Sequence, residues 1–112
     1  MRRHKYGDPM YHLHAAVCRA LGHPARLKVL DLLREGEECV CHLAPQVGVT
    51  ESNTSQLLAV LRRAGLVETR RDGHVIYYRV RDKRIFDVLD HLCEILADRI
   101  AEARDLAAAM ER

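Results

Sequence analysis

The fold of this chain is decided by residues 39–63, which read CVCHLAPQVGVTESNTSQLLAVLRR. Apolar residues in the first part recur at helical spacing up to Val47, and the Gly48 that follows suits a left-handed stop. Thr50 is a good N-cap for a second helix, the leucines within residues 52–63 form its apolar side, and Gly65 supplies its C-terminal cap. The stretch therefore predicts a short helix, a tight turn and a longer helix.

Signals for a β-hairpin follow this helical pair. Residues 67–70 and 75–80 are rich in β-branched and aromatic side chains, and the Asp72-Gly73 between them is a preferred type I′ turn. Arginines crowd the same region, at positions 62, 63, 70, 71, 79, 81 and 84. We therefore expect a hairpin with an Arg-rich tip directly after the second helix.

Helical periodicity also covers both ends of the chain. Apolar residues recur at helical spacing over residues 11–21, and Pro24 suits the first turn of a further helix that Gly36 ends. Asp82 can cap a long helix that runs to about residue 109. The apolar stripe of this last helix consists of Ile85, Leu89, Leu92, Leu96, Ile100 and Ala103. Such a stripe predicts a partner surface, and a dimer is consistent with so short a chain.

A helix, a turn and a second helix with a polar start form the helix-turn-helix arrangement, in which the second helix enters the DNA major groove. The hairpin would then act as a wing. Asn and Gln can pair bidentately with adenine, and arginines can hold phosphates. The candidate DNA-contact residues are Thr50, Glu51, Ser52, Asn53, Ser55, Gln56, Arg63, Arg70, Arg71, His74 and Arg79. The alternative is that the polar residues only cap and solvate the helix.

The composition is that of one ordinary globular domain. The 112 residues are 48% hydrophobic and 30% charged, a length that corresponds to a single domain over residues 1–112. No apolar run approaches the roughly 18 residues that a membrane span needs. The basic start of the chain (Arg2, Arg3 and Lys5) lacks the apolar stretch of a secretory signal. We therefore expect a cytoplasmic protein with no membrane partner.

The net charge of +2 says little, but the charges are unevenly distributed. Residues 50–85 contain eight basic and four acidic side chains, whereas residues 86–112 contain three basic and seven acidic ones. Clustered cations that replace condensed counterions are typical of phosphate binding, and a solvated face is the alternative. With one Phe and four Tyr, stacking on single-stranded nucleic acid is not expected.

Four cysteines are present, and in a reducing cytosol they are not expected to form a disulfide framework. Cys39 and Cys41 would project about 200° apart in a regular helix, but at a helix start both can reach one ion. Sulfur donors favour soft metals and As(III), and the adjacent His42 is a further candidate ligand. Cys18 and Cys93 are interpreted as small buried hydrophobes or, alternatively, as ligands or redox-active thiols.

Several segments together resemble one known family. They are ALGHPARL at 20–27, CVCHLA at 39–44, VTESNTSQL at 49–57, LRRAGLV at 61–67 and RRDGHVIYY at 70–78. In these segments the chain resembles the ArsR/SmtB family of bacterial winged helix-turn-helix repressors. The resemblance implies a mainly helical homodimer, held by its first and last helices, on double-stranded operator DNA with an inverted repeat. It also implies that an inducer releases the DNA.

The resemblance assigns a ligand site as well. Cys39 and Cys41 match the arsenic- and cadmium-responsive motif of the third helix. The implied inducer is As(III) or Sb(III), with Cd(II), Pb(II) or Zn(II) as alternatives. Arsenic-sensing relatives have a third cysteine three positions after the pair, where this chain has Ala44. Pyramidal As(III) prefers three sulfurs, so we expect Cys18 or Cys93, from the same or the partner subunit, to be the third ligand. The alternative is a two-thiolate site with a nitrogen or water ligand. The remaining histidines form no metal-binding spacing: His4, His12, His14, His23, His74 and His91.

Two other functions compete with a metal(loid)-released repressor. A thiol-redox or sulfide sensor of the same fold would respond through Cys18 and Cys93, as in the redox sensors of the family. A zinc-thiolate enzyme or metal carrier is the other alternative. It is disfavoured because no catalytic acid or base accompanies the cysteines, no Gly-rich phosphate loop is present, and a helical chain of 112 residues offers little pocket. We therefore expect a regulator and not an enzyme.

Overall fold

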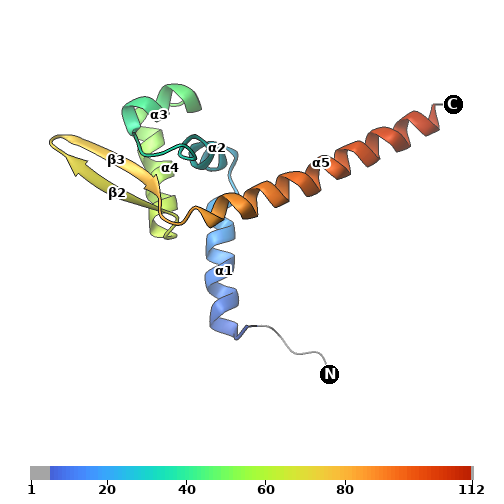
Figure 1. The fold of residues 1–112 in the computed structure, drawn as a ribbon, viewed down its shortest axis with the longest axis horizontal. Coiled ribbons are helices and arrows are strands. Elements are labelled where there is room, and N and C mark those ends of the chain that lie inside the picture. The colour runs from blue at the N-terminus through green and yellow to red at the C-terminus, as the bar shows by residue number, and fades with distance from the viewer. Residues whose placement is uncertain (1–5, 112) are drawn as a thin grey trace. The chain divides into compact units, whose positions relative to one another are not determined.

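The computed structural model describes residues 6–111, so Arg2, Arg3, His4 and Lys5 lie outside the described part. Its elements in chain order are α1 (Asp8–Leu21), α2 (Pro24–Leu32), β1 (Glu38–Cys39), α3 (Val40–Val47), α4 (Glu51–Arg63), β2 (Val67–Asp72), β3 (Val75–Val80) and α5 (Arg84–Met110) (Figure 1). The chain divides into two units, one ending at Asp82 and one beginning at Lys83. The second unit is a single helix, so one domain over residues 1–112 stays a prediction.

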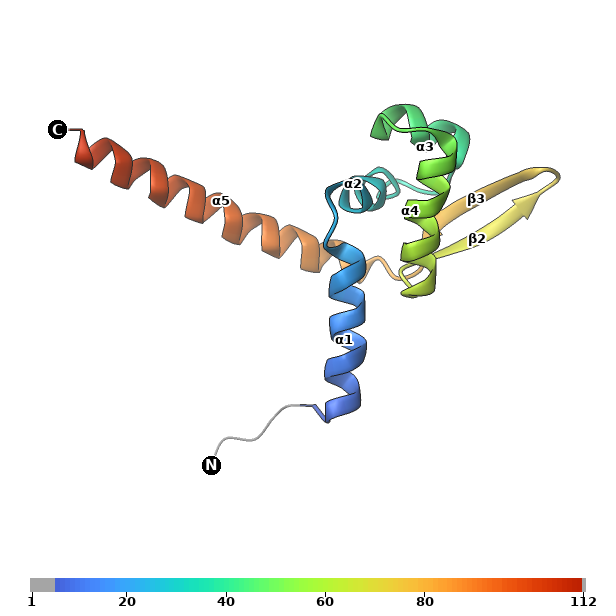
Figure 2. The ribbon, with the colours of Figure 1, turned by 180° about the vertical axis from the view of Figure 1, so that it is seen from behind.

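The predicted helical pair forms the centre of the first unit. α3 and α4 pack against each other, and both contact α2, as the view from behind shows (Figure 2). Leu30 of α2, Leu43 of α3 and Leu58 and Leu61 of α4 are fully buried. Burial of one leucine contributes roughly 1.5–3 kcal/mol. These side chains therefore hold α4 firmly against the other two helices.

Local capping sets the bounds of α4. Gly48, between α3 and α4, has a left-handed backbone with φ of 84°, and the Thr50 hydroxyl accepts a hydrogen bond from the Asn53 N–H at 3.0 Å. Gly65 follows the helix with φ of 79° in a Schellman motif, in which the next N–H donates to the Leu61 carbonyl at 3.0 Å. The predicted turn, N-cap and helix stop are confirmed.

The predicted hairpin is formed by β2 and β3, but its turn differs from the prediction. Asp72 pairs with Val75, so the loop consists of Gly73 and His74 rather than of Asp72 and Gly73. Of the two loop residues only Gly73 has a positive φ, 62°, whereas a type I′ turn needs two such residues. A glycine at the first loop position suits a type II′ turn. The predicted turn was therefore wrong by one residue.

A short third strand completes the sheet, in the order β1-β3-β2. The two residues of β1, Glu38 and Cys39, pair antiparallel with Tyr78 and Tyr77 of β3. This strand was not predicted from the sequence, because two residues cannot show an alternating pattern and their partners lie far along the chain. The pairing joins the start of α3 to the hairpin.

The end of α1 is fixed by an arginine from α2. The Arg26 Nε donates to the Ala20 carbonyl at 2.6 Å, and its Nη2 donates to the Arg19 carbonyl at 3.2 Å. Carbonyls in the last turn of a helix lack helical partners, and a cation there also complements the helix dipole. Arg26 therefore links α1 to α2. Along α1, Met10, Tyr11 and Leu13 remain exposed.

The second unit consists of α5. The Phe86 N–H donates a hydrogen bond to the Lys83 carbonyl at 3.1 Å, and Lys83 occupies the N-cap position. The predicted N-cap, Asp82, was wrong by one residue. Of the predicted apolar stripe of α5, Leu92, Leu96 and Ile100 are exposed on this chain, whereas Ile85 and Leu89 are partly buried. Val88 and Ile95 on the same helix are also exposed. Within residues 6–111 no helix combines the length and apolar character that a membrane span requires.

Candidate thiol centre and nucleic-acid interface

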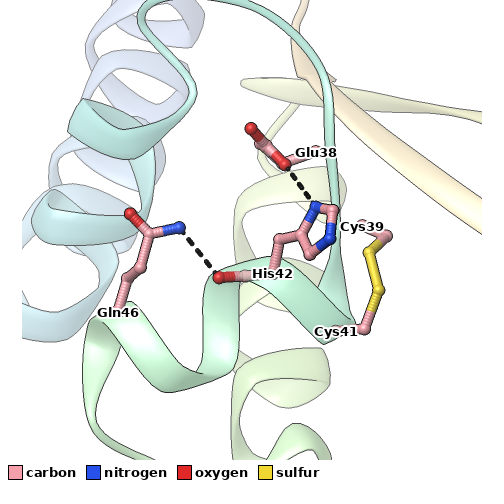
Figure 3. The surroundings of a disulfide bond; sticks show 5 residues. All are labelled: Glu38, Cys39, Cys41, His42 and Gln46. Atoms are coloured by element: carbon pink, nitrogen blue, oxygen red, sulfur yellow. Dashed lines mark hydrogen bonds and ion pairs between the residues drawn. A yellow bond between two sulfur atoms is a disulfide. The ribbon is translucent and has the colours of Figure 1, made fainter.

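The cysteine pair spans the start of α3. Cys39 ends β1 with an extended backbone (φ −87°, ψ 162°), and Cys41 is the second residue of α3. Their Cα atoms are 5.3 Å apart, and the two sulfurs are joined in a disulfide (Figure 3). A regular helix would direct the two side chains apart. The change of backbone geometry at Cys39 is what brings the sulfurs together.

The disulfide differs from the sequence analysis, which expected reduced thiols at this place. That expectation rested on the scarcity of disulfides in the cytosol. The extended backbone at the helix start lets Cys39 and Cys41 bond to each other as well as converge on an ion. The oxidation state decides which chemistry is available, because only the reduced pair offers thiolate ligands.

His42 lies beside the sulfur pair in the first turn of α3. Its Nδ1 is 3.1 Å from the Glu38 Oε2. The ligand atoms of His42, Cys39 and Cys41 all lie within 4.8 Å of one another. Figure 3 shows the imidazole between the carboxylate on one side and the sulfurs on the other. Cys39 is buried, whereas Cys41 and His42 are exposed and open to an incoming ion.

The donor set fits a thiophilic ion once the disulfide is reduced. Thiolates favour soft metals and As(III), and Zn(II) and Cd(II) also accept an imidazole. The three donor residues belong to one short segment, so one chain can provide the site. Ala44, at the position of the third cysteine in arsenic-sensing relatives, is 3% exposed and has no donor atom in its side chain.

An ion pair ties the segment before the cysteines to the hairpin. The Arg70 guanidinium donates to both carboxylate oxygens of Glu37, at 2.5 and 3.1 Å, and lies 4.8 Å from the centroid of the Tyr77 ring. The hydrogen bond from Arg70 lowers the pKa of Glu37 from its ordinary value. Together with the pairing of β1 and β3, this ion pair anchors the backbone that carries Cys39.

The cysteines line a hollow of about 410 Å³ that also contains candidate DNA-contact residues. Its lining includes Cys39, Cys41, Glu51, Ser52, Ser55 and His74. The two cysteines come from the start of α3, the next three residues from the start of α4, and the histidine from the hairpin loop. The candidate ligand site and part of the candidate DNA surface therefore share one space.

The other polar candidates on α4 lie on a different side of the helix. Asn53 and Gln56 line a second hollow, of about 380 Å³, together with His23 and Arg26 from the α2 end. Thr50 precedes them and caps the helix through its hydroxyl. The first turns of α4 are thus flanked by two hollows, and the exposed polar residues of α4 line one or the other.

The candidate arginines divide into two groups. Arg70 is bonded to Glu37, and Arg79 donates to Glu68 at 2.8 Å, so a phosphate would compete with a carboxylate for either one. Arg63, in the last turn of α4, and Arg71, on β2, are exposed. The hairpin keeps its basic character, but Arg70 also has a structural role that the sequence did not reveal.

Cys18 and Cys93 are free thiols, and both are exposed on this chain. Their interpretation as small buried hydrophobes is therefore wrong for the single chain. Cys18 lies on α1 and Cys93 on α5, whose apolar side chains are also largely exposed. Helical spacing identifies an apolar face, but it does not show whether the same chain covers that face.

Two acidic residues of the site were missed as partners. Glu37 and Glu38 contact Arg70 and His42, and neither contact was predicted from the sequence. The four-residue spacing from Glu38 to His42 was an available signal for the second contact. The first joins residues far apart in the sequence, and no local pattern marks it.

Comparison with known proteins identifies the family of this chain. The family model described as bacterial regulatory protein, arsR family, matches residues 23–69. The HTH-type transcriptional regulator Rv0081 of Mycobacterium tuberculosis is 42% identical over 106 residues, which cover 90% of this chain and 93% of the relative. The chain belongs to the arsR family. The crystal structure of Rv0081 matches with a TM-score of 0.76 at 39% identity, over 86% of this chain and 97% of that one.

Two further relatives agree with this assignment. The homodimeric winged helix-turn-helix DNA-binding domain Mb0332 of Mycobacterium bovis matches with a TM-score of 0.71 at 33% identity, over 88% of this chain and 90% of that one. The biofilm growth-associated repressor of Xylella fastidiosa is 36% identical over 89 residues, which cover 80% of this chain and 78% of the relative. The predicted family and winged helix-turn-helix fold are confirmed. This member of the arsR family is a DNA-binding transcriptional regulator and not an enzyme.

Proposed function

We propose that this arsR-family regulator is a repressor that a thiophilic metal(loid) releases from operator DNA. One observation carries the proposal: the sulfurs of Cys39 and Cys41 meet in the same hollow that the first turns of α4 and the hairpin loop line. A cytoplasmic location is part of the proposal, because thiols stay reduced there.

α4 is the recognition helix in this proposal. Glu51, Ser52 and Asn53 in its first turn are exposed, and so are Ser55 and Gln56 in the next. The N-terminal side chains of a recognition helix are those that reach base edges in the major groove. Arginines at the end of α4 and on the hairpin hold phosphates and fix the register without reading sequence.

The proposed DNA-binding form is a homodimer on an inverted repeat. Leu13 of α1 and Ile95 of α5 are 64% and 56% exposed, and each has further exposed apolar neighbours on its helix. Covering such surface contributes about 25 cal/mol per Å² of apolar area, which a second copy of the chain can provide. The two-fold symmetry of the dimer requires a matching symmetry in the operator.

As(III) is the first inducer in this proposal, and Sb(III) shares its preference for sulfur. The pair supplies two sulfurs, and Ala44 leaves α3 without the third. The free, exposed thiols Cys18 and Cys93 are candidate donors from a partner subunit. Cd(II), Pb(II) and Zn(II) are the alternative inducers, because each of them also accepts sulfur ligands.

The proposed ligand site is in direct contact with the elements that would bind DNA. α3 packs on α4, and β1, which contains Cys39, pairs with β3 of the wing. A ligand that draws the start of α3 therefore acts on the recognition helix and on the wing at once. A coupling of about 1–3 kcal/mol, typical of such linkage, lowers DNA affinity by about 5–150-fold.

Fluorescence anisotropy of the reduced protein on operator DNA, titrated with arsenite at fixed salt, tests this proposal. We expect release by wild type and by the control His91→Ala, an exposed histidine outside the proposed site. Cys18→Ser, Cys93→Ser should release less readily if one of these thiols is the third donor. The double variant Cys39→Ser, Cys41→Ser should stay bound. If this last variant still releases DNA on adding arsenite, the proposed site is wrong.

The disulfide favours a second candidate function, a thiol-redox repressor that uses the same pair. One hydrogen peroxide molecule would oxidise the thiols of Cys39 and Cys41 to the disulfide, and its two oxygens would leave as two waters that take up both thiol protons. This candidate differs from the sequence-based alternative, which used Cys18 and Cys93. Peroxide-driven release that Cys41→Ser abolishes, without any response to arsenite, would support it. DNA that stays bound to the fully oxidised protein would exclude it.

A further inference from the structure

His42 contacts Glu38 and also lies close to the sulfurs of Cys39 and Cys41. It is an exposed side chain, 69% accessible, and its contact with Glu38 resembles an ordinary surface ion pair, which contributes little to stability. Its imidazole, however, also lies within 4.8 Å of both sulfurs of the cysteine pair. One ring nitrogen faces the carboxylate and the other side of the ring faces the sulfurs (Figure 3).

We propose that His42 Nε2 is the third ligand for a divalent cation at Cys39 and Cys41, and that Glu38 is its positioning residue. The inference rests on the proposed function, in which the cysteine pair binds the inducer. It adds the ligand that α3 lacks at Ala44 and names the class of cation that uses it. Two thiolates and one imidazole form a donor set for Cd(II) and Zn(II), whereas As(III) uses the sulfurs alone.

The contact with Glu38 determines which ring nitrogen of His42 can bind a metal ion. The Glu38 Oε2 lies 3.1 Å from the His42 Nδ1, and a carboxylate oxygen can only accept, so in the neutral imidazole this contact places the proton on Nδ1 and the lone pair on Nε2, the other ring nitrogen. Metal-bound histidines commonly donate their second N–H to a carboxylate in this way. The backbone of Glu38 is held in turn by pairing with Tyr78 of β3. The imidazole therefore has its tautomer and orientation set before the ion arrives.

The side of the site that faces solvent leaves room for a fourth ligand. Cys39 is buried, whereas Cys41 and His42 are exposed, so an ion held by these three residues would still face solvent. Zn(II) and Cd(II) sites commonly have four ligands, and water can be the fourth here. The arrangement thus allows a cation to bind within one chain, without a donor from a partner subunit.

Cadmium titration of the reduced full-length protein, followed by the ultraviolet thiolate-to-metal absorption band, tests the inference. We expect His42→Ala to weaken Cd(II) binding at least about 10–100-fold, the range seen when even an outer partner is lost, and Glu38→Gln to weaken it less. The matched control is His91→Ala, because His91 is an equally exposed histidine with a glutamate partner, 3.6 Å from Glu94. It should leave Cd(II) affinity unchanged.

Two further readouts separate this inference from the proposed function. X-ray absorption at the cadmium edge should show a nitrogen neighbour in wild type that His42→Ala removes, while arsenite affinity stays within about twofold of wild type. Equal Cd(II) affinity and an equal absorption spectrum in His42→Ala would overturn the role of His42 and leave the thiol site intact. Binding of neither ion to the reduced pair would overturn the proposed function itself, and the inference with it.

Discussion

Replacing Gly48 by alanine tests whether the turn between α3 and α4 depends on a left-handed backbone. Gly48 has φ of 84°, and a Cβ built there would meet no atom within 4 Å. The substitution therefore introduces strain without a clash. A non-glycine residue in this conformation costs roughly 1–2 kcal/mol, and the stiffer unfolded chain offsets about 0.4–1 kcal/mol of that. We expect the free energy of unfolding to fall by about 1 kcal/mol.

Thermal unfolding followed by circular dichroism measures this change. For a small domain, 1 kcal/mol corresponds to a decrease in Tm of about 4–8 °C. Gly48→Asn is the matched control, because asparagine adopts the left-handed conformation more readily than alanine and should lower Tm less. An alanine variant as stable as wild type, or an asparagine variant less stable than the alanine one, would refute the reasoning that backbone conformation sets the cost.

Three more expectations follow from single contacts. Glu37→Gln should lower Tm at neutral pH, because it removes the carboxylate that pairs with Arg70. Arg70 holds the pKa of Glu37 below its ordinary value of 4.5, so the Tm difference from wild type should persist above pH 4.5 and vanish as the pH falls through the lowered pKa. A Tm difference that does not change with pH would contradict this prediction. Thr54→Ser removes a buried methyl and should cost about 1 kcal/mol in urea unfolding. Thr54→Val loses the hydrogen bond that the Thr54 hydroxyl donates to the Thr50 carbonyl at 2.9 Å, but it should cost less, because that carbonyl still accepts the Thr54 backbone N–H at 2.9 Å. Arg71→Ala should reduce the slope of log K against log salt on operator DNA by about 1 if this residue holds one phosphate, and an unchanged slope excludes the contact.

The elements that the sequence predicted well are those set by local chemistry. Thr50 and Gly65 bound α4 because a hydroxyl cap and a left-handed glycine act within one turn of the helix. The hairpin loop was placed one residue early because Asp72-Gly73 and Gly73-His74 both put a glycine in the turn. Only the register of the strands decides between them. β1 could not be predicted, since its two residues depend wholly on a distant strand.

In the candidate site, too, the local features were predictable from the sequence and the others were not. The convergence of Cys39 and Cys41 followed from their place at a helix start, which is a local property. The disulfide did not follow, because the oxidation state depends on the surroundings of the chain. The contact of Glu37 with Arg70 joins residues that are remote in sequence, so only the fold reveals that a candidate phosphate ligand is already bonded to a carboxylate.

Thermodynamic linkage places a strict requirement on the proposed function. A ligand that weakens DNA binding by some factor must itself bind more weakly to the DNA complex by the same factor. The shared hollow of about 410 Å³ makes this coupling local, because the cysteines and the start of α4 line the same space. Arsenite affinity measured with and without saturating operator DNA should therefore differ by the factor found in the release experiment. Unequal factors would mean that release has another cause, such as oxidation of Cys39 and Cys41, which removes the thiolates instead of binding to them.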